Sequence, residues 1–158
     1  MRRILSLWAV SVFLFVSNAY AAEVKDISVK QLEEELDNPK VARLFYLFTS
    51  WCSVCRQTIP NAVDVAQSYQ GDKFKMVFIS LDDGNNPMVQ SIADQDVEVW
   101  RVKQQSPIEV VRAFNKAGIR FQGSIPHISL IDAKGKILVD GGYDVRMLKP
   151  IIEELISE

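Results

Sequence analysis

The chain has two cysteines, Cys52 and Cys55, which are separated by two residues. An apolar run at residues 41–49 precedes them, and a helix is predicted to begin at Ser53. Unpaired N–H groups at a helix N-terminus favour a thiolate, so we expect the pKa of Cys52 to lie below the value of about 8.5 for a free cysteine. Such a thiolate attacks a disulfide to form a mixed disulfide, which a cysteine one turn further on can resolve. The pair therefore predicts thiol–disulfide exchange.

The residues around the two cysteines could modulate this chemistry. Arg56 would place a cation near the thiolate and lower the Cys52 pKa further, or it is a solvated residue of the first helical turn. Ser53 and Val54 bring neither charge nor proline, so they do not indicate a redox potential. Trp51 would shield the thiols or simply pack beside the strand.

Three other interpretations of the cysteines stay open. A structural disulfide or half of a shared metal site is one, although a bridge over two residues closes almost no loop. A Cu(I)-binding module or metallochaperone is another, because soft thiolates suit Cu(I) and His127 could add a ligand. A docking domain with idle thiols is the third. We expect no cofactor and no metal.

Residues 1–21 have the pattern of a secretory signal peptide. Arg2 and Arg3 precede the mostly apolar residues 4–16, and Ala19-Tyr20-Ala21 fits a cleavage site after Ala21. An uncleaved membrane anchor is the alternative, because residues 4–22 carry no charge and a spanning helix needs about 20 residues. In either case we expect the remaining domain outside the cytoplasm, in a bacterial periplasm.

Length and composition are those of one globular domain, residues 22–158. The chain has 158 residues, 48% of them hydrophobic, and a formal net charge of −2. A nucleic-acid binder needs a basic face, so we expect no nucleic-acid partner. Two cysteines cannot form a four-cysteine zinc site. We expect a monomer.

Hydrophobic periodicity predicts alternating helices and strands and hence an α/β fold with a central mixed sheet flanked by helices. Ser28 and Gln31 have the spacing of a capping box before the first helix, which Asn38-Pro39 should end. The other predicted elements are strands at 41–49, 74–81, 97–102, 127–132 and 137–140, and helices at 53–69, 87–95, 107–116 and 148–156.

Several of these features together resemble the thioredoxin superfamily. They are Trp51-Cys52-x-x-Cys55, Pro60 five residues further on, and Ser124-Ile125-Pro126 before a strand. The resemblance covers about residues 24–158 and implies a thioredoxin-like fold. It also implies that Pro126 forms a cis peptide bond beside the cysteines, and that Ile125 and Pro126 contact a substrate protein. We expect Trp51 to contact the substrate as well.

The segment from Pro87 to Val102 adds a helix and a strand to the minimal thioredoxin pattern. With the export signal, this insertion is similar to the TlpA/ResA branch of periplasmic thioredoxins, which includes cytochrome c maturation proteins. That resemblance implies a reductant of protein disulfides, with a membrane electron donor or another redox partner.

Two positions depart from the family pattern. Thioredoxins keep a buried Asp six residues before the first cysteine, where this chain has Tyr46. ResA-like proteins often carry a Glu three residues after the second cysteine, where this chain has Thr58. Another group must then take the proton from Cys55, which puts efficient reductase turnover in question.

Overall fold

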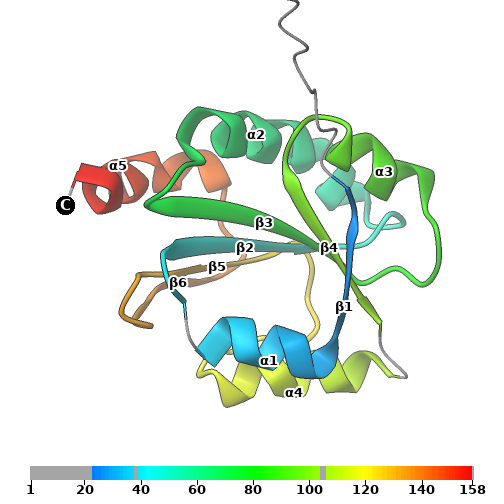
Figure 1. Ribbon diagram of the computed structural model, residues 1–158. Helices are drawn as coiled ribbons and strands as arrows, with labels where there is room; N and C mark the ends of the chain where they lie inside the picture. The colour runs from blue at the N-terminus through cyan, green and yellow to red at the C-terminus, as the bar shows by residue number, and fades with distance from the viewer. Residues whose placement is uncertain (1–22, 38, 104–105, 158) are drawn as a thin grey trace, which may run out of the picture.

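A single six-stranded sheet with helices on both faces forms the body of the protein in the computed structural model, which describes residues 23–37, 39–103 and 106–157 (Figure 1). The strands are β1 (Lys25–Ser28), β2 (Ala42–Phe48), β3 (Phe74–Ser80), β4 (Glu98–Lys103), β5 (His127–Ile131) and β6 (Ile137–Gly141). The helices are α1 (Val29–Asp37), α2 (Ser53–Tyr69), α3 (Pro87–Ala93), α4 (Pro107–Lys116) and α5 (Lys149–Ser157), with a 3₁₀ turn η1 (Val145–Leu148) before α5.

The sheet is mixed, as predicted, with strand order β1-β4-β3-β2-β5-β6. Strands β1 to β4 pair in parallel, whereas β5 is antiparallel to both β2 and β6. The inserted helix and strand are α3 and β4, and β4 lies between β1 and β3. The edge strand β1 was not predicted, because its four residues hold one buried side chain, Ile27, and show no readable alternation.

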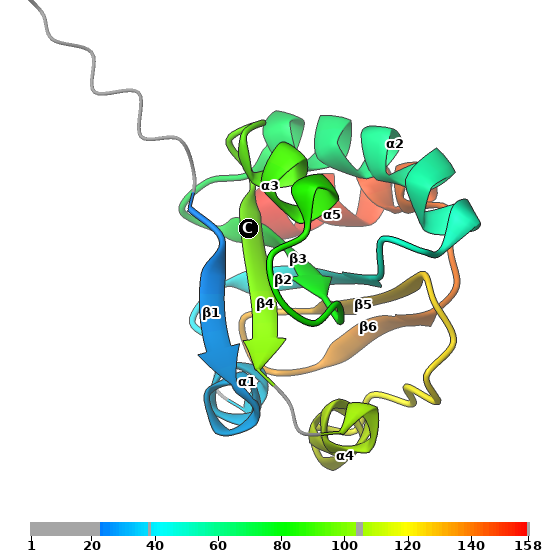
Figure 2. The same cartoon turned by 90° about the vertical axis from the view of Figure 1, so that its right-hand side faces the viewer.

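Two layers of helices cover the sheet. Helices α2, α3 and α5 lie on one face and α1 and α4 on the other (Figures 1 and 2). Alternate residues of β2 enter the two cores: Tyr46 packs on the α2 side, and Phe45 and Leu47 pack on the α1 side. This two-sided burial explains the continuous apolar run of β2.

Local sequence signals begin and end the helices. The predicted capping box is present, because Ser28 N–H donates to Gln31 Oε1 at 2.8 Å and Gln31 N–H donates to Ser28 Oγ at 3.2 Å. Ser106 Oγ caps α4 by accepting the N–H of Ile108. After α4 the chain turns at Gly118, whose φ of +85° suits glycine.

The last helix differs from the prediction. A single helix was expected from Leu148, but Leu148 ends the 3₁₀ turn and α5 begins at Lys149. Pro150 explains the boundary, because proline has no N–H to donate and is tolerated only in the first turn of a helix.

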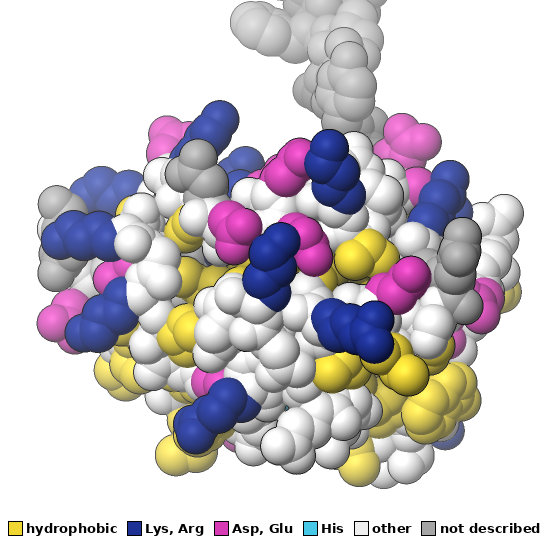
Figure 3. Space-filling model, turned by 90° about the horizontal axis from the view of Figure 1, so that it is seen from below, with side chains coloured by type: hydrophobic (Ala, Val, Ile, Leu, Met, Phe, Trp, Pro, Cys, Tyr) yellow, Lys and Arg dark blue, Asp and Glu magenta, His cyan; other side chains and the backbone are white. Residues whose placement is uncertain are grey.

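The face covered by α1 and α4 carries positive and negative side chains interspersed (Figure 3). One such pair joins the two helices, with Lys116 Nζ 2.8 Å from Glu33 Oε2. Among the described residues, no helix has the length and apolar character that a membrane span requires.

Candidate functional site

The two cysteines form a disulfide at the start of α2, directly after β2. Their Cα atoms are 5.2 Å apart. Cys52 is the N-cap of the helix, and its Sγ accepts the backbone N–H of Cys55 at 3.1 Å. The same N–H can stabilise a thiolate at Cys52 after reduction. Cys52 keeps 7% of its surface exposed and Cys55 none, so a partner can approach only the first cysteine.

The loop before β5 brings Ile125 and Pro126 to the disulfide. The Ile125–Pro126 peptide bond is cis, as the resemblance implied. The carbonyl oxygen of Ile125 lies 3.8 Å from Cys52 Sγ, although 73 residues separate them in the chain. An oxidised Cys52 has no S–H to donate, so this is a contact and not a hydrogen bond.

Exposed apolar side chains surround the more accessible sulfur. Trp51 is 73% exposed and Val54 is 52% exposed, and Ile125 is half-buried. The alternative that Trp51 packs beside the strand is therefore wrong. A partner protein that reaches Cys52 would meet this apolar rim, as expected of a surface that recognises another chain.

A family comparison bears directly on this arrangement. The model of the thioredoxin-like family matches residues 40–137, which include β2, the cysteines, α2, the insertion and the Ile125–Pro126 loop. The chain belongs to the thioredoxin-like family.

Individual relatives agree with this assignment. Thioredoxin 1 of Nostoc sp. is 39% identical over 71 residues, 45% of this chain and 61% of the relative. The chloroplastic thioredoxin-like protein HCF164 of Arabidopsis thaliana is 30% identical over 92 residues, 57% of this chain and 34% of the relative. The thioredoxin-like chain thus covers less than two thirds of either relative.

Solved structures share the fold. The thioredoxin domain of a thiol-disulfide oxidoreductase from Bacteroides vulgatus superimposes with a TM-score of 0.58 at 18% identity, covering 77% of this chain and 81% of that one. A thiol:disulfide interchange protein from Chlorobium tepidum gives 0.57 at 24% identity, covering 78% and 84%.

The two departures from the thioredoxin pattern contact each other. Tyr46 on β2 and Thr58 on α2 share a hydrogen bond of 2.6 Å between their hydroxyl oxygens. Thr58 Oγ1 also lies 2.9 Å from the Val54 carbonyl oxygen and 3.4 Å from that of Cys55. Burial raises the pKa of Tyr46, so its hydroxyl is neutral near pH 7. A hydroxyl pair thus takes the place of two carboxylate positions beside the buried cysteine.

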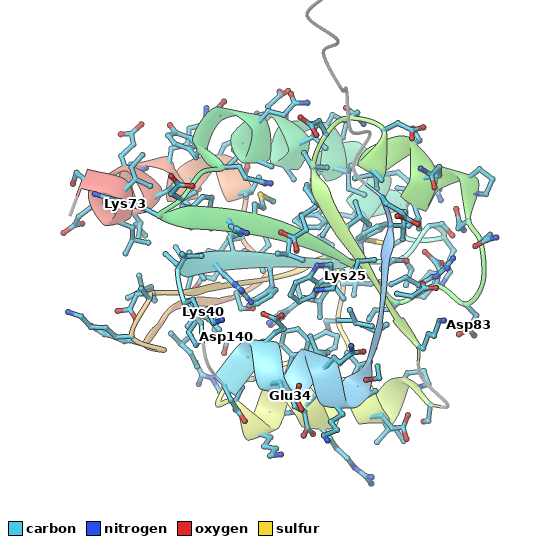
Figure 4. All side chains as sticks on the ribbon, in the orientation of Figure 1. Lys25, Glu34, Lys40, Lys73, Asp83 and Asp140 are labelled. Atoms are coloured by element: carbon cyan, nitrogen blue, oxygen red, sulfur yellow. A yellow bond between two sulfur atoms is a disulfide. The ribbon has the colours of Figure 1, made fainter. Side chains whose placement is uncertain are left out.

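His127 lies on the other face of the sheet from the disulfide. Its neighbour Ile128 points into the α2 core, whereas His127 packs on Phe121 of the α1 core with ring centroids 5.0 Å apart. Its Nε2 is 3.0 Å from Asp140 Oδ1, and Asp140 lies beneath the sheet in Figure 4. Desolvation lowers the His127 pKa despite this carboxylate. His127 therefore cannot join the cysteines as a copper ligand.

Among the described residues, no group of three or more His, Cys, Asp or Glu side chains is arranged to hold a metal ion.

Arg56 forms a specific hydrogen bond in addition to bringing a positive charge to the site. Its Nη1 donates to the carbonyl oxygen of Ser50 at 2.7 Å. Sequence reasoning missed Ser50 and its main partner, Asp82. Asp82 begins an Asp/Gly/Asn-rich stretch that indicates only a loop.

Proposed function

We propose that this protein is a thiol–disulfide oxidoreductase that exchanges disulfides with protein substrates. The observation that carries the proposal is the Cys52–Cys55 disulfide at the start of α2, with one sulfur at an apolar rim and the other fully buried. A disulfide that only stabilised the fold would not need this asymmetry, and a bridge over two residues adds little loop-closure entropy.

The two cysteines have different roles in the exchange. In the reducing direction, the Cys52 thiolate attacks one sulfur of a substrate disulfide, and the other substrate sulfur leaves as a thiolate that takes up a proton. Cys55 then loses its proton and attacks Cys52 Sγ, which breaks the mixed disulfide. Two electrons have then passed from Cys52 and Cys55 to the substrate. The substrate leaves with two thiols, and Cys52 and Cys55 are left as a disulfide. In the opposite direction the steps reverse.

We place the protein outside the cytoplasm as a monomeric reductant. Export rests on the signal pattern of residues 1–21, which lie outside the described residues. The reducing direction rests on the TlpA/ResA resemblance and on the inserted α3 and β4. Each catalytic cycle leaves Cys52–Cys55 oxidised, so a membrane electron donor or another redox partner must reduce it again. Cytochrome c maturation is the process that the resemblance suggests.

Single cysteine variants test the exchange activity. Cys52→Ser should abolish insulin reduction, whereas Cys55→Ser should accumulate a mixed disulfide that a non-reducing gel detects. Ser91→Ala changes an exposed residue of α3 outside the site, so it is the control and should keep wild-type activity. Insulin reduction by the Cys52→Ser variant would refute the proposal. Tight 1:1 Cu(I) binding by a wild type without exchange activity would favour the metallochaperone instead.

The direction can be measured separately. Equilibration with glutathione should give a redox potential nearer to about −270 mV, as in thioredoxin, than to about −120 mV, as in a strong oxidant. A value at the oxidising end would reverse the proposed direction.

Export is tested by sequencing the protein from a bacterial periplasmic fraction, which should find Ala22 at the N-terminus. Protein confined to the cytoplasm would contradict export. A deletion strain with normal c-type cytochromes would exclude a role in their maturation.

A further inference from the structure

Ser50, two residues before Cys52, is the meeting point of three other segments. Asp82 follows β3, Asn86 is the N-cap of α3, and Arg56 lies in the first turns of α2. All three side chains form hydrogen bonds to Ser50. We call these four residues the Ser50 clamp.

Asp82 makes the most contacts in the clamp. Ser50 N–H donates to Asp82 Oδ2 at 2.9 Å, and Ser50 Oγ donates to Oδ1 at 2.9 Å. Ser80 Oγ donates to Oδ2 at 3.0 Å. Only 9% of the Asp82 surface is exposed. Hydrogen bonds to a carboxylate are stronger than those between neutral groups, so Asp82 fixes both the backbone and the side chain of Ser50.

The other two members donate hydrogen bonds to the hydroxyl and carbonyl oxygens of Ser50. Asn86 Nδ2 donates to Ser50 Oγ at 2.7 Å, and Arg56 Nη1 donates to the Ser50 carbonyl at 2.7 Å. The turn then closes at once, because Cys52 N–H donates to the Thr49 carbonyl. The position of Cys52 is thus determined from both sides of Ser50.

The clamp also brings two opposite charges to the cysteine turn. Two residues of chain span at most about 7 Å, so the backbone of Cys52 lies within that distance of Ser50, to which the carboxylate is bound, and salt only partly screens a charge over such a distance. A negative charge disfavours the thiolate form, and the Arg56 guanidinium on the carbonyl side favours it. Because Asp82 is buried, salt screens its charge less than that of an exposed residue.

We propose that Asp82 is a positioning residue for Cys52, which holds the turn through Ser50 and whose charge limits how readily the Cys52 thiol ionises. This inference deepens the proposed thiol–disulfide exchange, since it concerns the reactivity of the attacking cysteine. Neither Asp82 nor Ser50 was identifiable from the sequence as part of the site, because 32 positions separate them.

Asp82→Asn tests the role of the charge, with Asp83→Asn as the matched control. Asp83 is exposed at the outer edge of the molecule (Figure 4), so both variants lose one negative charge from the same loop. In reduced protein at about pH 6, Asp82→Asn should raise the rate of Cys52 alkylation about threefold, because thiolate becomes more abundant. Asp83→Asn should stay within about 1.5-fold of wild type.

Equal rates in the two variants, or slower alkylation in Asp82→Asn, would overturn the proposal. Mass spectrometry of the alkylated peptide confirms that Cys52 reacted. If Asp82→Asn does not fold, Arg56→Gln provides the second test, because it changes an exposed side chain and should slow alkylation about threefold. If the rate of Cys52 alkylation were unchanged in Arg56→Gln, the Ser50 clamp would not control the reactivity of Cys52. Alkylation needs no exchange partner, so these results are independent of whether insulin reduction is found.

Discussion

The two sulfur atoms of the site differ in what can reach them. Cys52 has a small exposed surface at a helix N-terminus, whereas Cys55 is fully enclosed by the α2 core. Attack by the enclosed sulfur requires that Cys55 first loses its proton to another group. The Tyr46–Thr58 hydroxyl pair bridges β2 and α2 beside Cys55, at the two positions where this chain departs from the family pattern.

Tyr46→Phe should destabilise the protein by about 1 kcal/mol, because it removes one buried hydrogen bond and leaves the ring in place. Thr58 keeps its contact with the Val54 carbonyl, so no hydroxyl is left unpaired. Urea unfolding measures the change. Tyr143→Phe is the control, since Tyr143 is 52% exposed and its variant should match wild type. Equal stability of the two variants would show that the Tyr46 hydroxyl contributes nothing.

At the scale of elements, the strand–helix unit β2–α2 carries the cysteines, and short capping signals fix where the helices begin. The Ser28 capping box joins the edge strand β1 to α1, because Ser28 ends the strand and caps the helix.

Ser28→Ala should reduce the free energy of unfolding by about 1 kcal/mol, the usual cost of losing an N-cap. Ser91→Ala makes the same substitution at an exposed position inside α3, where alanine has the higher helix propensity. Chemical denaturation should therefore separate the two variants. A loss in Ser91→Ala as large as in Ser28→Ala would contradict the capping role.

Local patterns predicted most elements but few of the contacts around the site. Continuous apolar runs identified β2 and β3, and Cys52 and Cys55 marked the start of α2. The Tyr46–Thr58 and Asp82–Ser50 contacts depend on how separate elements pack, over 12 and 32 positions of sequence. No single window contains that information. The resemblance, rather than periodicity, supplied the place of Pro126 beside the disulfide.

At the scale of the whole molecule, the sheet separates two environments. The disulfide lies on the α2 side, and the single histidine lies on the α1 side, where the residue is 5% exposed. Burial lowers the His127 pKa, so the folded protein favours the neutral ring.

His127→Gln should remove a pH dependence of stability. The unfolded chain takes up a proton near its pKa of about 6.5, and the folded protein does so only at lower pH. Neutral His127 therefore contributes fully to the stability of the fold at pH values above the unfolded-state pKa of about 6.5, and this contribution is lost as the pH falls below that value. Wild type should lose stability between about pH 7.5 and 5.5 more steeply than the variant, as measured by urea midpoints. Parallel curves would refute this.

The central strand β2 pairs with β3 on one side and β5 on the other, and both of its faces are covered by helices. Backbone amides in such a strand exchange with solvent only in the rarest openings, whereas edge strands such as β1 and β6 open at lower free-energy cost. The cysteines follow β2 directly. The two cysteines are thus attached to the part of the sheet that unfolds last. Thiol–disulfide exchange should therefore persist while the edge strands open and close locally.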